Sequence, residues 1–327
     1  MASPSPPLEP LPKTPATARG VLAAPPLGGL SVFRVPCLRD NYAWVLVDAA
    51  TGAVAVVDPA EAAPVSQFIE AELGGRLDFI LNTHHHGDHV GGNEALCERF
   101  GATVVGAACD AKRIPRIGVR LSEGEKIKVG EAEAIVLETP GHTSGHIAFW
   151  FEKGKALFPV SLHSFLFFPV SCFSFRGVLV SRRSTTTLLQ NASPKKTILK
   201  TQGDTLFALG CGRLFEGDGP QMWQSLSKLL PLADDARVFC AHEYTQSNAR
   251  WATSLDAANA ELRLRATGID ADRKAGFATV PSLLGEEKRT NPFLRPFDPL
   301  IRKELGVSAE ASDAEAFTAI RKHKDKF

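Results

Sequence analysis

The seven residues T-H-H-H-G-D-H at positions 83–89 constrain this chain more than any other stretch. They follow the apolar run F-I-L at 79–81, which predicts a buried strand that ends in a loop. His84, His86 and Asp88 occupy alternate positions, so in an extended segment their side chains project to the same side. Imidazole and carboxylate ligands suit zinc, iron and other first-row metals. The motif therefore predicts a catalytic metal site, and its number of ligands favours two ions side by side.

Later parts of the chain supply further ligands. His142 follows a Pro-Gly turn after a strand predicted at 134–138, and His242 follows a strand predicted at 237–240. Asp204 lies on a predicted loop between these two histidines in the sequence. We therefore expect two ions that share one bridging carboxylate. The expected ligands are His84, His86 and His142 for the first ion, Asp88, His89 and His242 for the second, and Asp204 for both.

Asp58 closes a strand predicted at 54–57, just before a helix predicted at 62–73. At that position a carboxylate either caps the helix or supports a metal ligand from behind through a hydrogen bond. Both readings of Asp58 stay open at this point.

Between residues 31 and 158, short strands alternate with helices, which predicts an α/β layered core. Beyond Cys240 the strands stop and the pattern becomes helical. A capping box, S-D-A-E at 312–315, marks the start of the last helix. The helices expected in this part cover residues 246–254, 256–266 and 313–324.

Composition limits the remaining possibilities. The six cysteines are scattered without a C-x-x-C pair, which indicates reduced thiols in an intracellular, cytoplasmic protein. The net charge of +1 leaves no basic footprint for nucleic acid outside residues 159–202. Residues 1–30 are rich in proline, alanine and serine, so we expect a disordered extension; a mitochondrial or plastid targeting peptide is the alternative.

Residues 159–202 break the pattern of the chain. They contain six Lys or Arg residues, no acid, and a Phe-rich run that His163, Pro169 and Arg176 interrupt, which argues against a membrane span. Long segments without structure of their own are uncommon inside compact domains. We therefore interpret 159–202 as an anomalous insertion that derives from translation of an unspliced non-coding segment.

These motifs together resemble the metallo-β-lactamase superfamily and, within it, the hydroxyacylglutathione hydrolase (glyoxalase II) family. The resemblance implies an αββα sandwich over residues 31–245, followed by a helical substrate-binding domain over 246–327. It rests on the metal motif and on F-R-V-P-C-L-R-D-N-Y at 33–42, P-G-H-T-S-G-H at 140–146, G-D-T-L-F-A-L-G-C-G-R-L-F-E-G at 203–217, H-E-Y-T at 242–245 and N-P-F-L-R at 291–295.

The resemblance further implies an enzyme of methylglyoxal detoxification that cleaves S-D-lactoylglutathione to glutathione and D-lactate. Separately from the resemblance, we expect a monomer. A hydroxide bridging two zinc, iron or manganese ions would attack the thioester, with Asp88 orienting it and accepting its proton. By the same resemblance, glutathione contacts Arg213, Phe215, Tyr244, Arg321 and Lys324.

Several points remain open in this interpretation. Phe215 stands where the family often has tyrosine, and Arg321 and Lys324, taken alone, read as a solvated basic helix face. Two rival functions also remain: a mononuclear-iron persulfide dioxygenase of the same fold, and an inactive product caused by the insertion.

Overall fold

The structure is a computed structural model that describes residues 20–21, 28–159 and 205–327. Most of the predicted N-terminal extension, all of the predicted insertion except Pro159, and Asp204 therefore lie outside the described residues.

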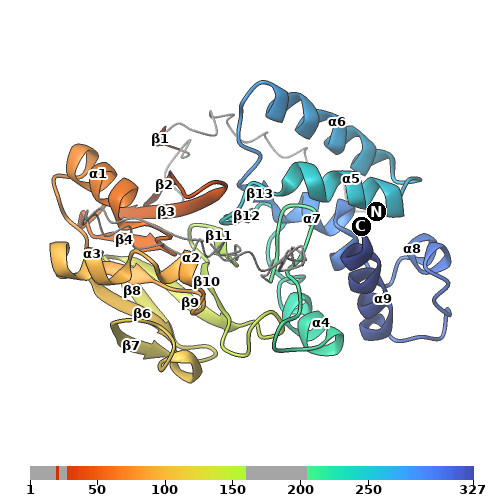
Figure 1. Cartoon of the computed structure of the whole chain (residues 1–327), viewed down its shortest axis with the longest axis horizontal. Helices are drawn as coiled ribbons and strands as arrows, with labels where there is room; N and C mark the ends of the chain where they lie inside the picture. The colour runs from red at the N-terminus through yellow and green to blue at the C-terminus, as the bar shows by residue number, and fades with distance from the viewer. Residues whose placement is uncertain (1–19, 22–27, 160–204) are drawn as a thin grey trace, which may run out of the picture.

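Two β-sheets form the centre of the molecule (Figure 1). The first has the strand order β1-β2-β3-β4-β5-β6-β7, antiparallel from β1 to β4 and parallel from β4 to β7. Its strands are β1 (Gly20–Val21), β2 (Leu30–Cys37), β3 (Asn41–Asp48), β4 (Val54–Val57), β5 (Phe79–Leu81), β6 (Thr103–Ala107) and β7 (Ile117–Leu121).

The second sheet has the order β13-β12-β11-β10-β9-β8, in which only β11 and β12 are parallel. The prediction that strands end near Cys240 is wrong, because β13 pairs with β12 through Leu283 and Arg237. A two-residue strand carries no alternation that a sequence pattern can reveal. The strands are β8 (Lys126–Val129), β9 (Ala132–Glu138), β10 (Ile147–Phe151), β11 (Ala156–Phe158), β12 (Arg237–Val238) and β13 (Ser282–Leu283).

Alternate residues of β3 and β4 belong to different cores, as the period of a strand requires. Trp44 and Val57 face the second sheet in a core that includes Phe149, whereas Val45 and Val56 belong to a separate cluster on the outer face. Helices α1 (Ala62–Glu72) and α3 (Asn93–Phe100) cover that outer face, because their buried side chains belong to the same cluster.

The C-terminal part is helical, as predicted, and lies beside the sandwich (Figure 1). The predicted start of the helix at 256–266 is wrong. This helix, α6 (Ala260–Lys274), begins at Ala260, because the Asn259 side chain caps it by accepting a hydrogen bond from Leu262 N. The capping box of the last helix is confirmed. The helices here are α4 (Gly219–Ser227), α5 (Thr245–Leu255), α6 (Ala260–Lys274), α7 (Leu284–Thr290), α8 (Pro299–Glu304) and α9 (Asp313–Lys326).

Strand ends converge where the two sheets meet. β4 and β5 are parallel and in register at Val57 and Leu81, so the loops that follow them leave the same edge of the first sheet. The two sheets are joined at this edge by a hydrogen bond from Ile147 N to Thr83 O. Segments far apart in the sequence therefore meet in one place, and the predicted ligands lie there.

Candidate metal centre

The first group of predicted ligands comes together as expected. The ligand atoms of His84, His86 and His142 all lie within 4.8 Å of one another. His142 Nε2 is 3.1 Å from His86 Nδ1, and both His84 and His142 are buried. The loop after β5 supplies two of these imidazoles, and the loop after β9 supplies the third.

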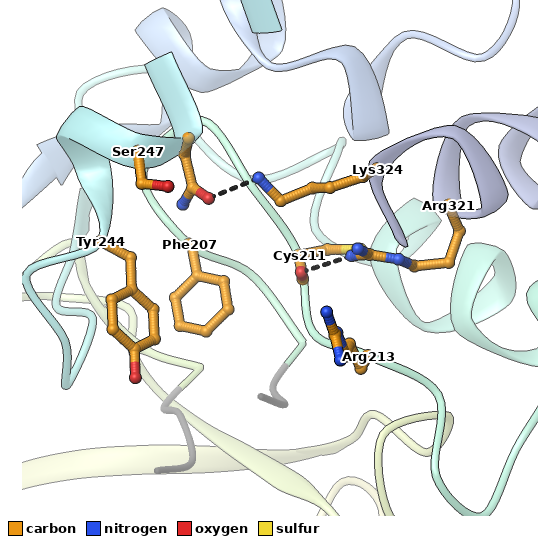
Figure 2. A pocket seen from close by; sticks show the side chains of 8 residues that line it. Phe207, Cys211, Arg213, Tyr244, Ser247, Arg321 and Lys324 are labelled. Carbon is orange, nitrogen blue, oxygen red and sulfur yellow. Dashed lines mark hydrogen bonds between the residues drawn. The ribbon is translucent and has the colours of Figure 1, made fainter. Parts of the chain in front are cut away.

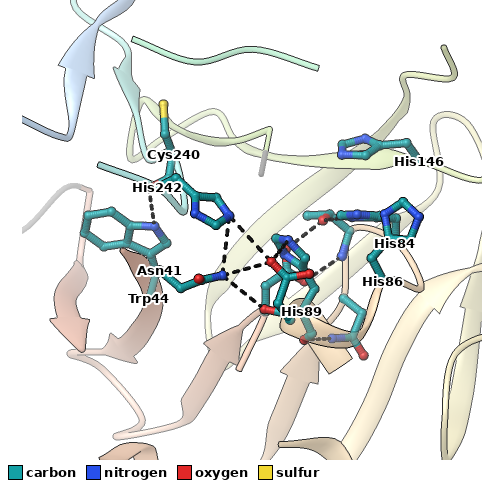
Figure 3. Close-up of polar contacts among 12 residues, drawn as sticks. Asn41, Trp44, His84, His86, His89, His146, Cys240 and His242 are labelled. Carbon is teal, nitrogen blue, oxygen red and sulfur yellow. Dashed lines mark hydrogen bonds and ion pairs between the residues drawn. The ribbon is translucent and has the colours of Figure 1, made fainter. Parts of the chain in front are cut away.

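The second group lies next to the first (Figure 3). The ligand atoms of Asp88, His89 and His242 also lie within 4.8 Å of one another, and all three side chains are buried. Asp88 Oδ2 is 3.5 Å from His89 Nε2 and 3.6 Å from His242 Nε2. The short helix α2 (Gly87–Val90) carries the first two side chains, and the segment after β12 carries the third.

Three of the imidazoles form a hydrogen bond through Nδ1, the ring nitrogen on the side away from the ligand groups. His89 Nδ1 is 3.1 Å from Asp58 Oδ2, and His242 Nδ1 is 2.9 Å from Asp40 Oδ1. His142 Nδ1 is 2.9 Å from the carbonyl oxygen of Arg213. An acceptor at Nδ1 fixes the proton there and leaves the Nε2 lone pair for an ion.

Asp58 supports a predicted ligand. Its carboxylate accepts hydrogen bonds from Thr83 N and Thr83 Oγ1 at 2.9 and 2.6 Å, in addition to its contact with His89. The helix-capping alternative is wrong, because Glu61 occupies the N-cap position of α1. A third group of Asp58, His84 and His89 is also close enough for an ion, but the contacts with Thr83 and His89 already engage both oxygens of Asp58.

The site fits cations. Among the described residues, His84 Nε2, His89 Nε2 and Asp88 Oδ1 are buried and have no hydrogen-bond partner. Buried polar atoms without partners are costly, so their concentration at one place calls for a ligand that accepts lone pairs. Metal ions bound by these groups would meet this requirement.

The protonation states of four of the expected ligands agree with metal binding. At His242, burial is outweighed by hydrogen bonds with Asp40 and Asp88, which raise its pKa. Burial lowers the pKa of His84 and of His142 well below the ordinary value, and burial with nearby imidazoles lowers the pKa of His86 to about 3. Burial alone would raise the pKa of Asp88, but His89 and His242 outweigh it and bring the pKa to about 2. Neutral imidazoles and an ionised carboxylate are the forms that bind metal.

Two further histidines of the motifs stay outside both groups. His85 Nδ1 is 2.9 Å from Asp110 Oδ2. His146 stacks on His84 with ring centroids 5.0 Å apart, and its Nδ1 is 2.8 Å from Thr139 Oγ1. Both side chains therefore pack next to the ligand groups and belong to neither of them.

Figure 2 shows a pocket and the side chains that line it. The pocket adjoins the metal centre, because the ring of its lining residue Tyr244 stacks on that of His242. Four of the five predicted substrate contacts line it, and the other four lining residues were not predicted. A local sequence pattern gives no sign of which distant side chains will meet: Asn248 meets Lys324 across 76 residues, and Cys211 meets Arg321 across 110. The predicted members are Arg213, Tyr244, Arg321 and Lys324, and the additional ones are Phe207, Cys211, Ser247 and Asn248.

Arg321 and Lys324 are not on a solvated face, so that alternative is wrong. Arg321 is only 3% exposed, and its Nη1 donates to Cys211 O at 2.9 Å. Lys324 Nζ donates to Asn248 Oδ1 at 2.7 Å and lies 4.5 Å from the centroid of the Trp251 ring. Burial, followed by the nearby positive charge of Arg321, lowers the pKa of Lys324 to about 7.

The fifth predicted contact, Phe215, lies at the metal centre instead of in the pocket. The residue is 43% exposed, and its ring centroid is 5.1 Å from that of His142 and 6.4 Å from that of His86. Its contact with substrate stays a prediction. Two polar residues beside the second group, Asp40 and Asn41, were not predicted either, although the motif at 33–42 contains them.

Family models match both parts of the chain. The model of the metallo-beta-lactamase superfamily matches residues 38–159, and the model described as hydroxyacylglutathione hydrolase C-terminus matches residues 243–327. Among solved structures, ETHE1 from Myxococcus xanthus is similar in fold, with a TM-score of 0.53 and 23% identity over 89% of each chain. The fold and the paired ligand groups define a protein of the metallo-β-lactamase superfamily.

Curated relatives narrow this class. The hydroxyacylglutathione hydrolase of Methylococcus capsulatus is 47% identical, and that of Ruegeria pomeroyi is 44% identical. Both alignments cover 91% of this chain and 99% of the relative. The chain therefore belongs to the hydroxyacylglutathione hydrolase family.

Proposed function

We propose that the chain hydrolyses S-D-lactoylglutathione to glutathione and D-lactate with two divalent metal ions. One observation carries this proposal: Tyr244 lines the pocket, and its ring also stacks on His242 of the second ligand group, with centroids 4.7 Å apart. A thioester whose glutathione part occupies the pocket would therefore have its acyl end at the metal centre.

The ligands of the two ions would be the two groups of side chains, together with Asp204, which lies outside the described residues. When bound, the ions supply a water activated for attack at neutral pH and stabilise negative charge on the thioester oxygen. Asp88 would orient this water and accept its proton at Oδ1, the oxygen that has no hydrogen-bond partner among the described residues. The thiolate of glutathione leaves readily, so no strong general acid is required.

The pocket would bind the rest of the substrate. Arg213, Arg321 and Lys324 bring three basic side chains to one cavity, which suits the two carboxylates of glutathione. The Tyr244 side chain would pack between the tripeptide and the metal centre.

The proposal also covers the identity of the metal, the oligomeric state, the location and the partners of the chain. We expect zinc as the metal, with iron or manganese as alternatives, because all three suit histidine and carboxylate ligands. We also expect a cytoplasmic monomer, with a mitochondrial or plastid location as the alternative, and no nucleic-acid or membrane partner. No helix within the described ranges is long and apolar enough to cross a membrane.

Metal analysis combined with a thioester assay tests the proposal against its rivals. The purified chain lacking residues 159–202 should hold two ions and release free thiol from S-D-lactoylglutathione. A mononuclear-iron persulfide dioxygenase would hold one iron and would not need a second complete ligand group. An inactive product would hold no stoichiometric metal and would not hydrolyse the thioester.

A further inference from the structure

Asn41 lies at the tip of the β2–β3 hairpin, directly against the loop that carries His242. The two residues form an isolated antiparallel bridge, and Tyr42 N donates to Ala241 O at 2.6 Å. The Asn41 side chain is only 2% exposed. The backbone therefore holds this amide at a fixed place beside the second ligand group (Figure 3).

The side-chain amide of Asn41 faces hydrogen-bond acceptors of Asp88. Asn41 Nδ2 donates to Asp88 Oδ2 at 3.0 Å and to Asp88 O at 3.4 Å. It is also 3.3 Å from His242 Nε2, the ring atom that would bind the second ion. These surroundings require the NH₂ group, and not the amide oxygen, to point at the ligands.

We infer that Asn41 is a positioning residue for the second metal ion, an inference that rests on the proposed two-ion function. Its amide fixes the rotation of the Asp88 carboxylate, so that Oδ2 is presented to the second ligand group and Oδ1 is left for the reacting water. A neutral donor suits this task, because a lysine or arginine at the same place would neutralise Asp88 and compete with the ion.

The effect should be confined to one ion. Among the described residues, the hydrogen bonds of the Asn41 side chain reach Asp88 and His242 but none of the three imidazoles of the first group. Loss of an outer hydrogen-bond partner typically costs 10–100-fold in metal affinity or activity. We therefore expect Asn41→Ala to weaken the second ion by about 10–100-fold and to leave the first ion in place.

The control is Asn93→Ala. Asn93 is a second fully buried amide near the motif, but its side chain donates to Asn82 Oδ1 and Pro115 O, outside both ligand groups. Asn41→Leu, which keeps most of the side-chain volume, separates loss of the amide from the effect of a cavity. Each variant is made in the full-length chain and in the chain lacking residues 159–202.

The measurements are the number of zinc ions retained per chain during a chelator titration, and the melting temperature with and without zinc. Asn41→Ala and Asn41→Leu should release one ion at lower chelator concentration and lose part of the stabilisation by zinc, whereas Asn93→Ala should release both ions as the wild type does. Wild-type chains that never hold two ions would contradict the proposed function. A wild type with two ions and Asn41 variants with unchanged affinity, or with equal losses of both ions, would overturn the inference about Asn41.

Discussion

The imidazole of His242 and the phenol ring of Tyr244 stack nearly parallel, at 11° with centroids 4.7 Å apart. One side chain belongs to a ligand group and the other lines the pocket. The hydrogen bond from His142 Nδ1 to Arg213 O is a second such connection, because the Arg213 side chain also lines the pocket. The metal centre and the pocket are therefore neighbouring parts of one site.

Replacing both Arg321 and Lys324 with alanine should raise KM for a glutathione thioester far more than it lowers kcat. Charges remote from the reacting bond contribute mainly to uniform binding. Each hydrogen bond to a carboxylate should contribute about 1.5–3 kcal/mol, so each lost contact should raise KM by roughly tenfold or more. Steady-state kinetics check this, with Lys322→Ala, an exposed position on the same helix, as the control. An unchanged KM would remove the two side chains from the substrate site.

Substrate binding should weaken as the pH rises. Burial lowers the pKa of Lys324 to about 7, so the free enzyme loses this positive charge as the pH rises through that value. The charge is present below pH 7, where it favours a bound carboxylate, and KM should therefore be lower at pH 6 than at pH 8.5. Lys324→Arg keeps its charge throughout this range, so its KM should vary less. The same pH dependence in both proteins would exclude Lys324 as the titrating group.

Asp204→Ala should remove both ions or most of their occupancy. A shared carboxylate anchors each ion and reduces their mutual repulsion, so its loss affects two sites at once. Elemental analysis after dialysis checks this prediction. Two tightly held ions in the variant would show that Asp204 is not the bridge.

Deleting residues 159–202 should increase the solubility, metal content and thioester hydrolase activity of the protein. Phe158, just before the segment, is buried and stacks on Phe239 at 4.8 Å, and Leu206, just after Asp204, is buried in the same core. The two flanks thus belong to one core. We expect the shortened chain to be soluble, to bind two ions and to hydrolyse the thioester, and the full-length chain to aggregate or bind metal poorly.

The ends of this deletion should be varied by about two residues, because element boundaries are the least certain part of a sequence interpretation. Equal solubility, metal content and activity in the two chains would contradict the proposal. Peptides within 161–200 recovered from the protein in its source cell would also contradict it.

The fold and the two ligand groups could be predicted because they depend on local patterns. Alternate spacing in the motif at 83–89, and histidines directly after apolar strands, place side chains without knowledge of distant contacts. Resemblance to a family added the pocket residues, and four of the five lie there.

The contacts that were not predicted join residues far apart in the chain. Asp40 meets His242 across 202 positions, and Arg321 meets Cys211 across 110. Such pairs depend on how the hairpin and α9 pack, which no local period reveals. The short strand β13 was missed for the same reason, because only its pairing with β12 defines it as a strand.

The most direct test of the central claim is the number of metal ions per active chain. Purified protein lacking residues 159–202 should contain two ions, lose thioester hydrolysis when a chelator removes them, and regain it as zinc, iron or manganese is added back toward two per chain. Full hydrolysis of S-D-lactoylglutathione by a chain with one ion would contradict the account of a two-ion thioester hydrolase. The absence of hydrolysis in a chain with two bound ions would contradict it as well.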